Sequence, residues 1–314
     1  MNKFIRKTTF LFSLLIGLIL MLISIVILLN SDNHIDYPTA IRKKYKRLDS
    51  LKESQKIIII GGSSSSYSIN SELMQNTLQK PIVNTSLAMS LGSQFQLNLV
   101  KDYLQKGDII LYIPEYEFYY GNENGDDFLY TTAFYYPNMI KDFTKAQKIK
   151  ALKQSFRLSI DYLKSLFIKQ IKKSSPISLQ YNASSYNYLG DNIGLINMDT
   201  TLINTETKNR YQKLKTKQVS TVFIQFLKDF NVFCKKKGVK LLVTFPPIEA
   251  SQYDNRFVNA VQSVENQTGT MYIGNPMESV FTFDYFYDSS YHLNGKGRVV
   301  RTDRLIKTLK KAIN

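Results

Sequence analysis

Between residues 57 and 113, short apolar runs alternate with helical patterns, and this rhythm limits the folds open to the chain more than any other feature. The runs lie at 57–60, 81–87 and 108–113, and the first consists of four isoleucines. Short, continuous apolar runs rich in β-branched residues are typical of strands buried on both faces of a sheet. Strand, helix and strand at these lengths predict parallel βαβ units, and hence a three-layer α/β/α domain with a central parallel sheet.

The rhythm is lost from about 116 to 215. This stretch is rich in Tyr, Phe, Asn and Lys, with one long helical pattern around Ile149, Leu152 and Phe156. We interpret it as an insertion over the carboxyl edge of the sheet, where its aromatic residues either stack on sugar rings or pack the insertion onto its host. The elements predicted after it are a helix at 218–237, a strand at 239–245, a helix at 255–267, a strand at 271–273 and a terminal amphipathic helix.

Two segments more than two hundred residues apart carry the side chains that point to chemistry. The first strand runs into Gly61-Gly62-Ser63-Ser64, and Asp288 and His292 precede the terminal helix. A serine hydroxyl at the carboxyl end of a strand can act as a nucleophile, with a histidine as its base and an aspartate to orient that histidine. The other histidine, His34, directly follows the apolar N-terminal segment, so His292 is the candidate base.

These motifs resemble those of the SGNH/GDSL hydrolase superfamily, whose members begin with a strand and Gly-Asp-Ser or a variant, and end with Asp-x-x-His or a variant. The resemblance covers about 55–115 and 216–314. It implies a flavodoxin-like fold with Ser63 as nucleophile, His292 as base and Asp288 as acid, with Ser64 as the second candidate nucleophile. Asp288 lies four residues before His292 rather than three, as in membrane-anchored members that act on envelope polymers.

The resemblance also implies oxyanion donors: a Gly after the second strand and an Asn after the third, besides the amide of the nucleophile. The stretch after the second strand begins at Asn84 and contains Gly92, so we expect Gly92 and the amides of Ser63 and Ser64 to hold the oxyanion. Glu115 follows the third strand where the Asn is expected. It either holds a substrate hydroxyl or an active-site loop, or caps a surface turn.

Residues 8–30 form a nearly continuous apolar segment without charge. About 20 apolar residues suffice to cross a bilayer as a helix, and no Ala-x-Ala-like cleavage signature follows. We therefore predict an uncleaved signal anchor behind a cytoplasmic tail at 1–7. A polar tether with one amphipathic stretch is expected at 31–55, and the domain at 56–314.

The charges around this segment bear on its orientation. Lys3, Arg6 and Lys7 precede it and favour a cytoplasmic N-terminus, whereas a second basic cluster follows at 42–47. Because the first group abuts the apolar segment, we expect the domain outside the cytoplasm, in a bacterial cell envelope. If the cluster at 42–47 decided the orientation, a cytoplasmic lipid or thioester hydrolase would be the more plausible protein.

The charge and the missing motifs restrict the partners. The net charge is +16, but the Lys and Arg residues are scattered, so we expect an anionic envelope polymer or lipid headgroups as partners and no nucleic acid. A Lys-rich proteome is the alternative explanation of the charge. Without a Gly-x-x-x-x-Gly-Lys or Gly-x-Gly-x-x-Gly motif, and with one Cys, Cys234, expected to be a buried thiol, we expect no cofactor and no metal.

The predicted function is that of a membrane-anchored serine O-acyltransferase or esterase acting on envelope polysaccharide or another acylated glycan. A polytopic membrane acyltransferase is a conceivable partner that would deliver acyl groups across the bilayer. The alternative is a catalytically degenerate SGNH-like domain that binds glycan or scaffolds an acylation complex. A glycosidase with two carboxylates from Glu115, Glu117 and Asp288 would leave Ser63 and His292 unexplained.

Overall fold

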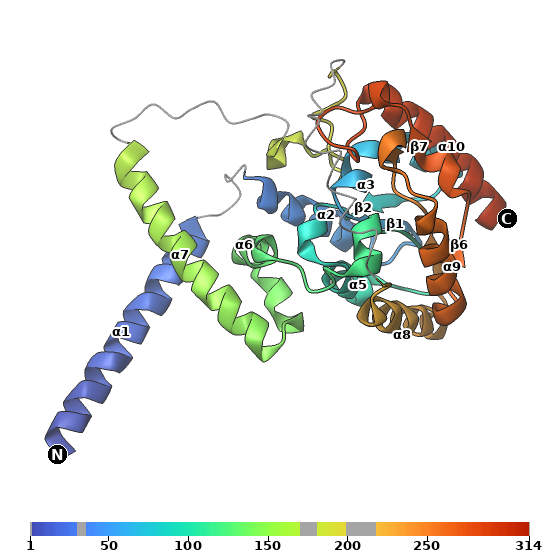
Figure 1. The fold of residues 1–314 in the computed structure, drawn as a ribbon. Coiled ribbons are helices and arrows are strands. Elements are labelled where there is room, and N and C mark those ends of the chain that lie inside the picture. The colour runs from blue at the N-terminus through green and yellow to red at the C-terminus, as the bar shows by residue number, and fades with distance from the viewer. Residues whose placement is uncertain (1, 30–35, 170–180, 199–217, 314) are drawn as a thin grey trace.

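A five-stranded parallel sheet forms the centre of the protein (Figure 1). The computed structural model describes residues 2–29, 36–169, 181–198 and 218–313, so His34 and parts of the expected insertion lie outside the described residues. The strand order is β2-β1-β3-β4-β6, and all pairings are parallel. The strands are β1 (Ile57–Gly61), β2 (Ile82–Asn84), β3 (Ile109–Ile113), β4 (Lys240–Val243) and β6 (Met271–Tyr272).

The predicted α/β class and parallel sheet are confirmed. Every residue of β1 and β3 is buried, as the apolar runs indicated. Successive side chains of a strand point to opposite faces of the sheet. Ile57 and Ile59 accordingly join one hydrophobic cluster with α4 and α10, whereas Ile58 and Ile60 join another with α2, α5, α8 and α9. The helices are α2 (Ala40–Ser50), α4 (Ser71–Leu78), α5 (Ser93–Val100), α8 (Thr221–Lys237), α9 (Arg256–Thr268) and α10 (Gly295–Ile313).

The amphipathic stretch expected within a polar tether is the helix α2, which belongs to the folded core. Ala40, Ile41, Tyr45 and Leu48 of this helix are buried in the cluster that contains Ile58. Lys44 is also fully buried; its Nζ donates hydrogen bonds to the carbonyl oxygens of Asn84 and Gly190. The basic residues between the apolar ones hid this buried face in the sequence, so residues 40–50 are not a tether.

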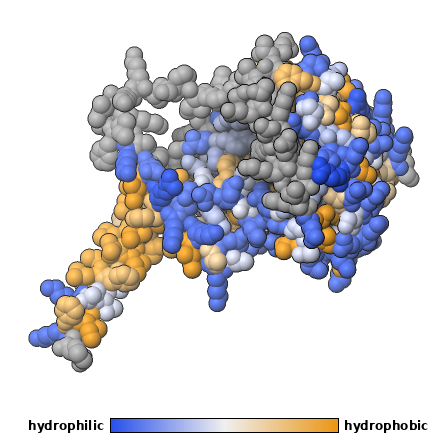
Figure 2. All heavy atoms as spheres, in the orientation of Figure 1, coloured by the Kyte–Doolittle hydropathy of each residue, from blue (hydrophilic) through white to orange (hydrophobic). Residues whose placement is uncertain are grey.

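The N-terminal helix α1 (Asn2–Leu29) projects from the body of the protein, and Figure 2 shows its largely hydrophobic surface. Its segment Lys3–Val26 is long and apolar enough to cross a membrane. Near its C-terminal end, α1 meets α6 (Asp127–Tyr135) and is crossed by α7 (Lys145–Lys169). Val26 is buried there in a small cluster with Phe134 and Tyr135.

A second, smaller parallel pairing was not predicted. The strands β5 (Ile248–Glu249) and β7 (Val280–Phe281) form a two-stranded sheet at the edge of the C-terminal region. Each strand has only two residues, too few to give an apolar run in the sequence. The β5 strand also positions the loop before α10, because the amide of Glu249 donates a hydrogen bond to the Ser290 carbonyl at 3.1 Å.

Candidate active site

The strand order places two predicted site residues at the same edge of the sheet. From β1 the chain crosses to β2 on one side and then returns to β3 on the other, so the direction of winding changes between β1 and β3. In open α/β sheets, ligand sites lie at the carboxyl ends of the strands at such a point. Ser63 follows β1 after one glycine, and Glu115 follows β3 after one proline.

Ser63 begins the short helix α3 (Ser63–Ser68) and is half-buried, whereas the five residues after it are buried. Within the described part of the chain, its hydroxyl makes no hydrogen bond. The Ser66 amide donates to the Gly62 carbonyl at 3.3 Å, which closes the first turn of the helix. Ser63 is therefore the one serine of the run 63–66 that is not fully buried.

The neighbouring Ser64 is held by Glu115. The carboxylate of Glu115 accepts a hydrogen bond from the Ser64 hydroxyl at 2.7 Å, from the Ser64 amide at 3.2 Å and from the Gly62 amide at 3.1 Å. A side chain at Gly62 would overlap this carboxylate, which explains the glycine. Glu115 is 1% exposed, and burial raises its pKa to about 7, although the bond from Ser64 opposes the shift. Glu115 thus lies beneath the serine turn, and Ser64 is its partner.

His292 is held in a tight loop that brings Asp288 against its ring. The Asp288 Oδ1 lies 2.8 Å from the His292 Nδ1, and the two side chains are 22% and 14% exposed. The loop closes because the Tyr287 amide donates to the His292 carbonyl at 2.9 Å and the His292 amide donates to the Ser289 carbonyl at 3.3 Å. Because of this turn, the Asp288 carboxylate reaches the imidazole of His292, four residues later in the sequence.

The imidazole of His292 packs on helix α3. Its ring lies 4.5 Å from the ring of Tyr67, measured between centroids, at an interplanar angle of 32°. Residues four apart share one face of a helix, and long side chains lean toward the helix N-terminus, so Tyr67 covers the turn that begins at Ser63. The Asp288–His292 pair therefore packs on α3 through Tyr67, four residues after Ser63 in the same helix.

Tyr291 connects the histidine loop to the end of β3. Its hydroxyl donates to Glu117 Oε2 at 2.9 Å and accepts from the Tyr116 amide at 3.2 Å. The carboxylate of Glu115, two residues before Glu117, likewise accepts hydrogen bonds from the serine turn. Three consecutive residues after β3 thus hold both the segment with Ser63 and the segment with His292.

The structure adds a tyrosine that the sequence did not point to. The Tyr181 hydroxyl donates to Asp288 Oδ2 and lies 3.5 Å from His292 Nδ1. Its ring lies 6.0 Å from that of Tyr67, and the side chain is 39% exposed. Tyr181 belongs to the expected insertion, where many tyrosines occur and no pattern distinguishes one from another.

Gly92 and Asn84 have other partners. Gly92 adopts a φ of +79°, and its amide donates to the Met89 carbonyl at 2.9 Å. A side chain there would overlap the backbone of residues 123–125. Asn84 is fully buried, and its Nδ2 donates to the Ser65 carbonyl at 3.2 Å and to Asp191 at 2.9 Å. Asn84 thus holds the backbone of α3, whereas Gly92 holds the turn before α5, and no hydrogen bond joins either of them to Ser63 in the described residues.

Asp191 is the centre of a buried polar network that the sequence did not reveal. Its carboxylate accepts from the Ser71 amide at 2.7 Å, from the Ser71 hydroxyl at 2.6 Å and from Arg298 at 3.1 Å, in addition to Asn84. Asp191 and Arg298 are 0% and 5% exposed. The network links β2 to the start of α4 and to α10, the two helices next to the serine turn and the histidine loop.

The described residues show no group of three or more His, Cys, Asp and Glu side chains that could hold a metal ion. Cys234 is buried in the described core, and burial raises the pKa of its thiol to about 12.

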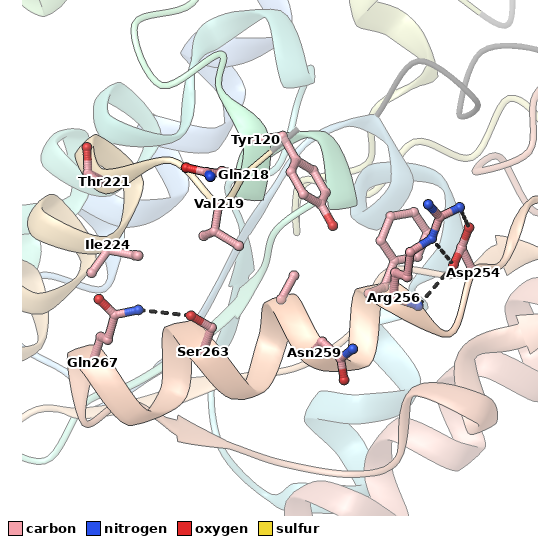
Figure 3. A pocket seen from close by; sticks show the side chains of 12 residues that line it. Tyr120, Gln218, Val219, Thr221, Ile224, Asp254, Arg256, Asn259, Ser263 and Gln267 are labelled. Atoms are coloured by element: carbon pink, nitrogen blue, oxygen red, sulfur yellow. Dashed lines mark hydrogen bonds and ion pairs between the residues drawn. The ribbon is translucent and has the colours of Figure 1, made fainter. Parts of the chain in front are cut away.

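A pocket of about 440 Å³ lies away from the serine, between the start of α8 and one face of α9 (Figure 3). Asn259, Ser263 and Gln267 of α9 line it at four-residue intervals, and the side chain of Tyr120 points toward α9 from the opposite side. Arg256 is paired with Asp254 at its rim, at 2.7 Å. Neither Ser63 nor His292 lines this pocket.

No protein-family model and no curated protein matches the chain. Among solved structures, one match is the protein YxiM from Bacillus subtilis, at 12% sequence identity and a TM-score of 0.37. The match covers 82% of this chain and 57% of that protein, so the chain spans less than two thirds of its length. Similarity at this level assigns neither a fold family nor a function.

Proposed function

We propose that the protein is a serine acyl-enzyme, an O-acyltransferase or esterase that acts on envelope polysaccharide. The observation that carries the proposal is the position of His292, with Asp288 on its Nδ1 and its ring packed on Tyr67 of α3, the helix that Ser63 begins. Serine, histidine and aspartate have these relations in enzymes that transfer acyl groups.

In the proposed mechanism, the Ser63 Oγ attacks the carbonyl carbon of an ester. Because Asp288 binds the Nδ1 of His292, Nε2 is the nitrogen that takes the serine proton and then gives it to the leaving alkoxide. The product of this step is an acyl ester on Ser63 and a free alcohol. A sugar hydroxyl or water then attacks the acyl ester, returns its proton through His292 and restores the serine.

For the oxyanion we propose fewer donors than the three amides expected from the sequence. The Ser64 amide donates to Glu115 and the Gly92 amide to Met89, so the Ser63 amide is the donor that we propose. Loss of one oxyanion donor lowers the rate by about 10² to 10³. A slow enzyme is therefore expected, unless substrate binding frees the Ser64 amide from Glu115.

The fold proposal follows from the sheet and its two hydrophobic clusters. The order β2-β1-β3-β4-β6 is the flavodoxin-like order of five strands, and the two clusters fit helices on both faces of the sheet. We propose a three-layer α/β/α domain of the SGNH type, similar to membrane-anchored members such as the D-alanyl transfer protein of teichoic acid assembly. The helix α1 would hold the domain at the outer face of the membrane, where a polytopic acyltransferase could supply acyl groups.

A fluorophosphonate probe tests the assignment, because it labels activated serines covalently. Ser63→Ala should abolish labelling of the full-length protein. Ser64→Ala is the matched control: it leaves the proposed nucleophile in place and should retain most labelling. Unchanged labelling of Ser63→Ala, with loss in Ser64→Ala, would move the nucleophile by one residue. Labelling that survives both changes would reject the serine mechanism.

A glycan-binding domain without catalysis is the second candidate, and the pocket in Figure 3 favours it. Its hydroxyl and amide side chains on α9, with Tyr120 beside them, are of the kinds that hold sugar hydroxyls and rings. Turnover of a chromogenic acetyl ester that disappears in Ser63→Ala supports the enzyme. Glycan binding that survives Ser63→Ala but is lost in Asn259→Ala, without any ester turnover, supports the binding domain.

A further inference from the structure

Helix α7 exposes a row of large apolar side chains. Ile149, Leu152 and Phe156 are 58%, 53% and 40% exposed. Their spacing of three and four residues places them on one face of the helix. Exposed apolar side chains that stand singly are ordinary, but a row of them on one helix marks an interaction surface.

The opposite face of α7 is already packed, so the helix cannot simply rotate to bury the apolar row. Ala151 and Ser155 are 2% and 8% exposed and lie against the body of the protein. The Gln154 Nε2 donates to the Thr131 Oγ1 of α6 at 3.0 Å. The Lys150 Nζ lies 6.0 Å from the centre of the Tyr130 ring, also of α6. These contacts fix the orientation in which the apolar row faces outward.

The row lies close to the end of the apolar N-terminal helix. Val26, the last residue of the apolar span, packs with Tyr135 of α6, and Leu158 and Leu163 of α7 pack against this cluster. Figure 1 shows α7 crossing α1 near the C-terminal end of α1. The exposed row begins less than one helical turn before Leu158 and extends away from it toward Lys145. If α1 spans a bilayer, the row lies at the level of the bilayer surface.

The charges on this part of α7 complement an anionic surface. Between Lys145 and Arg157 the helix carries five basic residues and no acidic one. Lys148, Lys153 and Arg157 are exposed beside the apolar row. A helix with an apolar face flanked by lysines and arginines is typical of helices that lie in the interface of anionic membranes.

We propose that the first half of α7 lies in the headgroup region of an anionic bilayer and immerses Ile149, Leu152 and Phe156 in its surface. The protein would then contact the membrane at two places, through α1 and through α7. The apolar row lies close to the end of α1 and is flanked by basic residues, and both features favour lipid over a second protein as the partner that covers it. The proposal does not depend on the acyl-enzyme mechanism.

Site-directed spin labelling of the full chain in lipid vesicles tests the proposal. The labels are attached to Ile149→Cys, Leu152→Cys and Phe156→Cys, one at a time. Val222→Cys on α8 and Val299→Cys on α10 are matched controls, because these valines are 51% and 52% exposed outside α7. Cys234 is fully buried, and the unsubstituted protein shows whether it takes up label. Vesicles of phosphatidylcholine are compared with vesicles that also contain phosphatidylglycerol.

The readout is the ratio of collisions with oxygen, which partitions into lipid, to collisions with a water-soluble nickel chelate. In vesicles with phosphatidylglycerol, the ratio at the three α7 positions should exceed that at Val222 and Val299 by about tenfold. Equal ratios at all five positions would reject the proposal and leave a second protein as the occupant of the row.

A charge-reversed variant tests the electrostatic part separately. Lys148→Glu combined with Lys153→Glu should remove the effect of phosphatidylglycerol on the label at Leu152→Cys, since each basic residue near an anionic surface contributes a roughly fivefold factor in binding. Both lysines are exposed, and an unchanged circular dichroism spectrum shows that the helix remains. An unchanged lipid effect in the variant would contradict the role of these charges.

Discussion

Glu115 is the buried acid that supports the serine turn. Replacing it by Ala and by Gln should distinguish the contribution of its hydrogen bonds to stability from that of its charge. Glu115→Ala leaves the Gly62 and Ser64 amides without their acceptor, so the free energy of unfolding should fall by about 3 kcal/mol. Glu115→Gln keeps one carbonyl oxygen and should lose less. Denaturant unfolding of both variants at pH 7 measures the difference. Equal losses would mean that the carboxylate does not accept these bonds.

Single residues also show where prediction from sequence ends. Ser63, Asp288 and His292 could be selected because each is next to a recognisable strand or helix signal and histidines are few. Tyr181 and Asp191 could not be selected, since both belong to a stretch without apolar rhythm. Their contacts with Asp288 and Arg298 depend on how that stretch folds back onto α3 and α10.

The loop with His292 depends on its attachment to the end of β3, and Tyr291 makes that attachment. Tyr291→Phe removes the acceptor of the buried Tyr116 amide and the donor to Glu117. We expect a loss of about 1–3 kcal/mol in stability. We also expect a lower kcat at nearly constant KM, because the imidazole loses its fixed position.

Tyr287→Phe is the matched control for Tyr291→Phe. Tyr287 lies in the same loop, and its hydroxyl makes no hydrogen bond with any residue that the structure describes. Thermal unfolding and ester hydrolysis measure both variants. If the two variants behave alike, the attachment through Tyr291 does not position the histidine.

The network around Asp191 joins three elements and should be sensitive to loss of charge. Asp191→Asn keeps the shape of the side chain but removes the counter-charge of the buried Arg298. Removing one partner of a buried ion pair costs about 3–5 kcal/mol. In the double variant with Arg298→Met, the loss should be smaller than the sum of the two single losses. Additive losses in urea unfolding would show that the pair is not coupled.

Elements were predicted best where one kind of residue dominates a short run. The strand expected at 57–60 is Ile57–Gly61, and the one expected at 108–113 is Ile109–Ile113. Helix α2 was underestimated because its basic residues mask a buried face. The pairing of β5 with β7 was missed because two-residue strands depend on tertiary contacts rather than on a local pattern.

The pH dependence of stability should reflect two buried groups that oppose each other. Burial raises the pKa of Glu115 from 4.5 to about 7, so between these values the unfolded chain loses a proton that the folded chain keeps, and stability falls as pH rises. Burial lowers the pKa of Lys44 from 10.5 to about 7, although Asp191 opposes the shift. Between pH 7 and 10.5 the unfolded chain binds the extra proton, and stability rises with pH.

These two groups together predict a minimum of stability near pH 7. Unfolding in urea from pH 5 to pH 10 measures it, with a slope of at most about 1.4 kcal/mol per pH unit from each group. Glu115→Gln should flatten the profile below pH 7, and Lys44→Met should flatten it above. If Glu115→Gln kept the wild-type slope below pH 7, Glu115 would not cause that slope. If Lys44→Met kept the wild-type slope above pH 7, Lys44 would not cause that one.

The orientation of the whole molecule decides which substrates the site can meet. Lys3, Arg6 and Lys7 lie in the first two turns of α1, directly before its uncharged apolar part, whereas the basic cluster at 42–47 begins more than ten residues beyond Leu29. The charges that abut the apolar segment enter the translocation machinery first, so the N-terminus should stay in the cytoplasm.

A C-terminal alkaline phosphatase fusion should then be active, and a C-terminal green fluorescent protein fusion exported by the Sec pathway should be dark. The opposite result would place Ser63 and His292 in the cytoplasm and replace envelope polysaccharide by a lipid or thioester substrate. The immersion of α7 would remain possible in either orientation, because that helix needs only an anionic leaflet on the side of the domain.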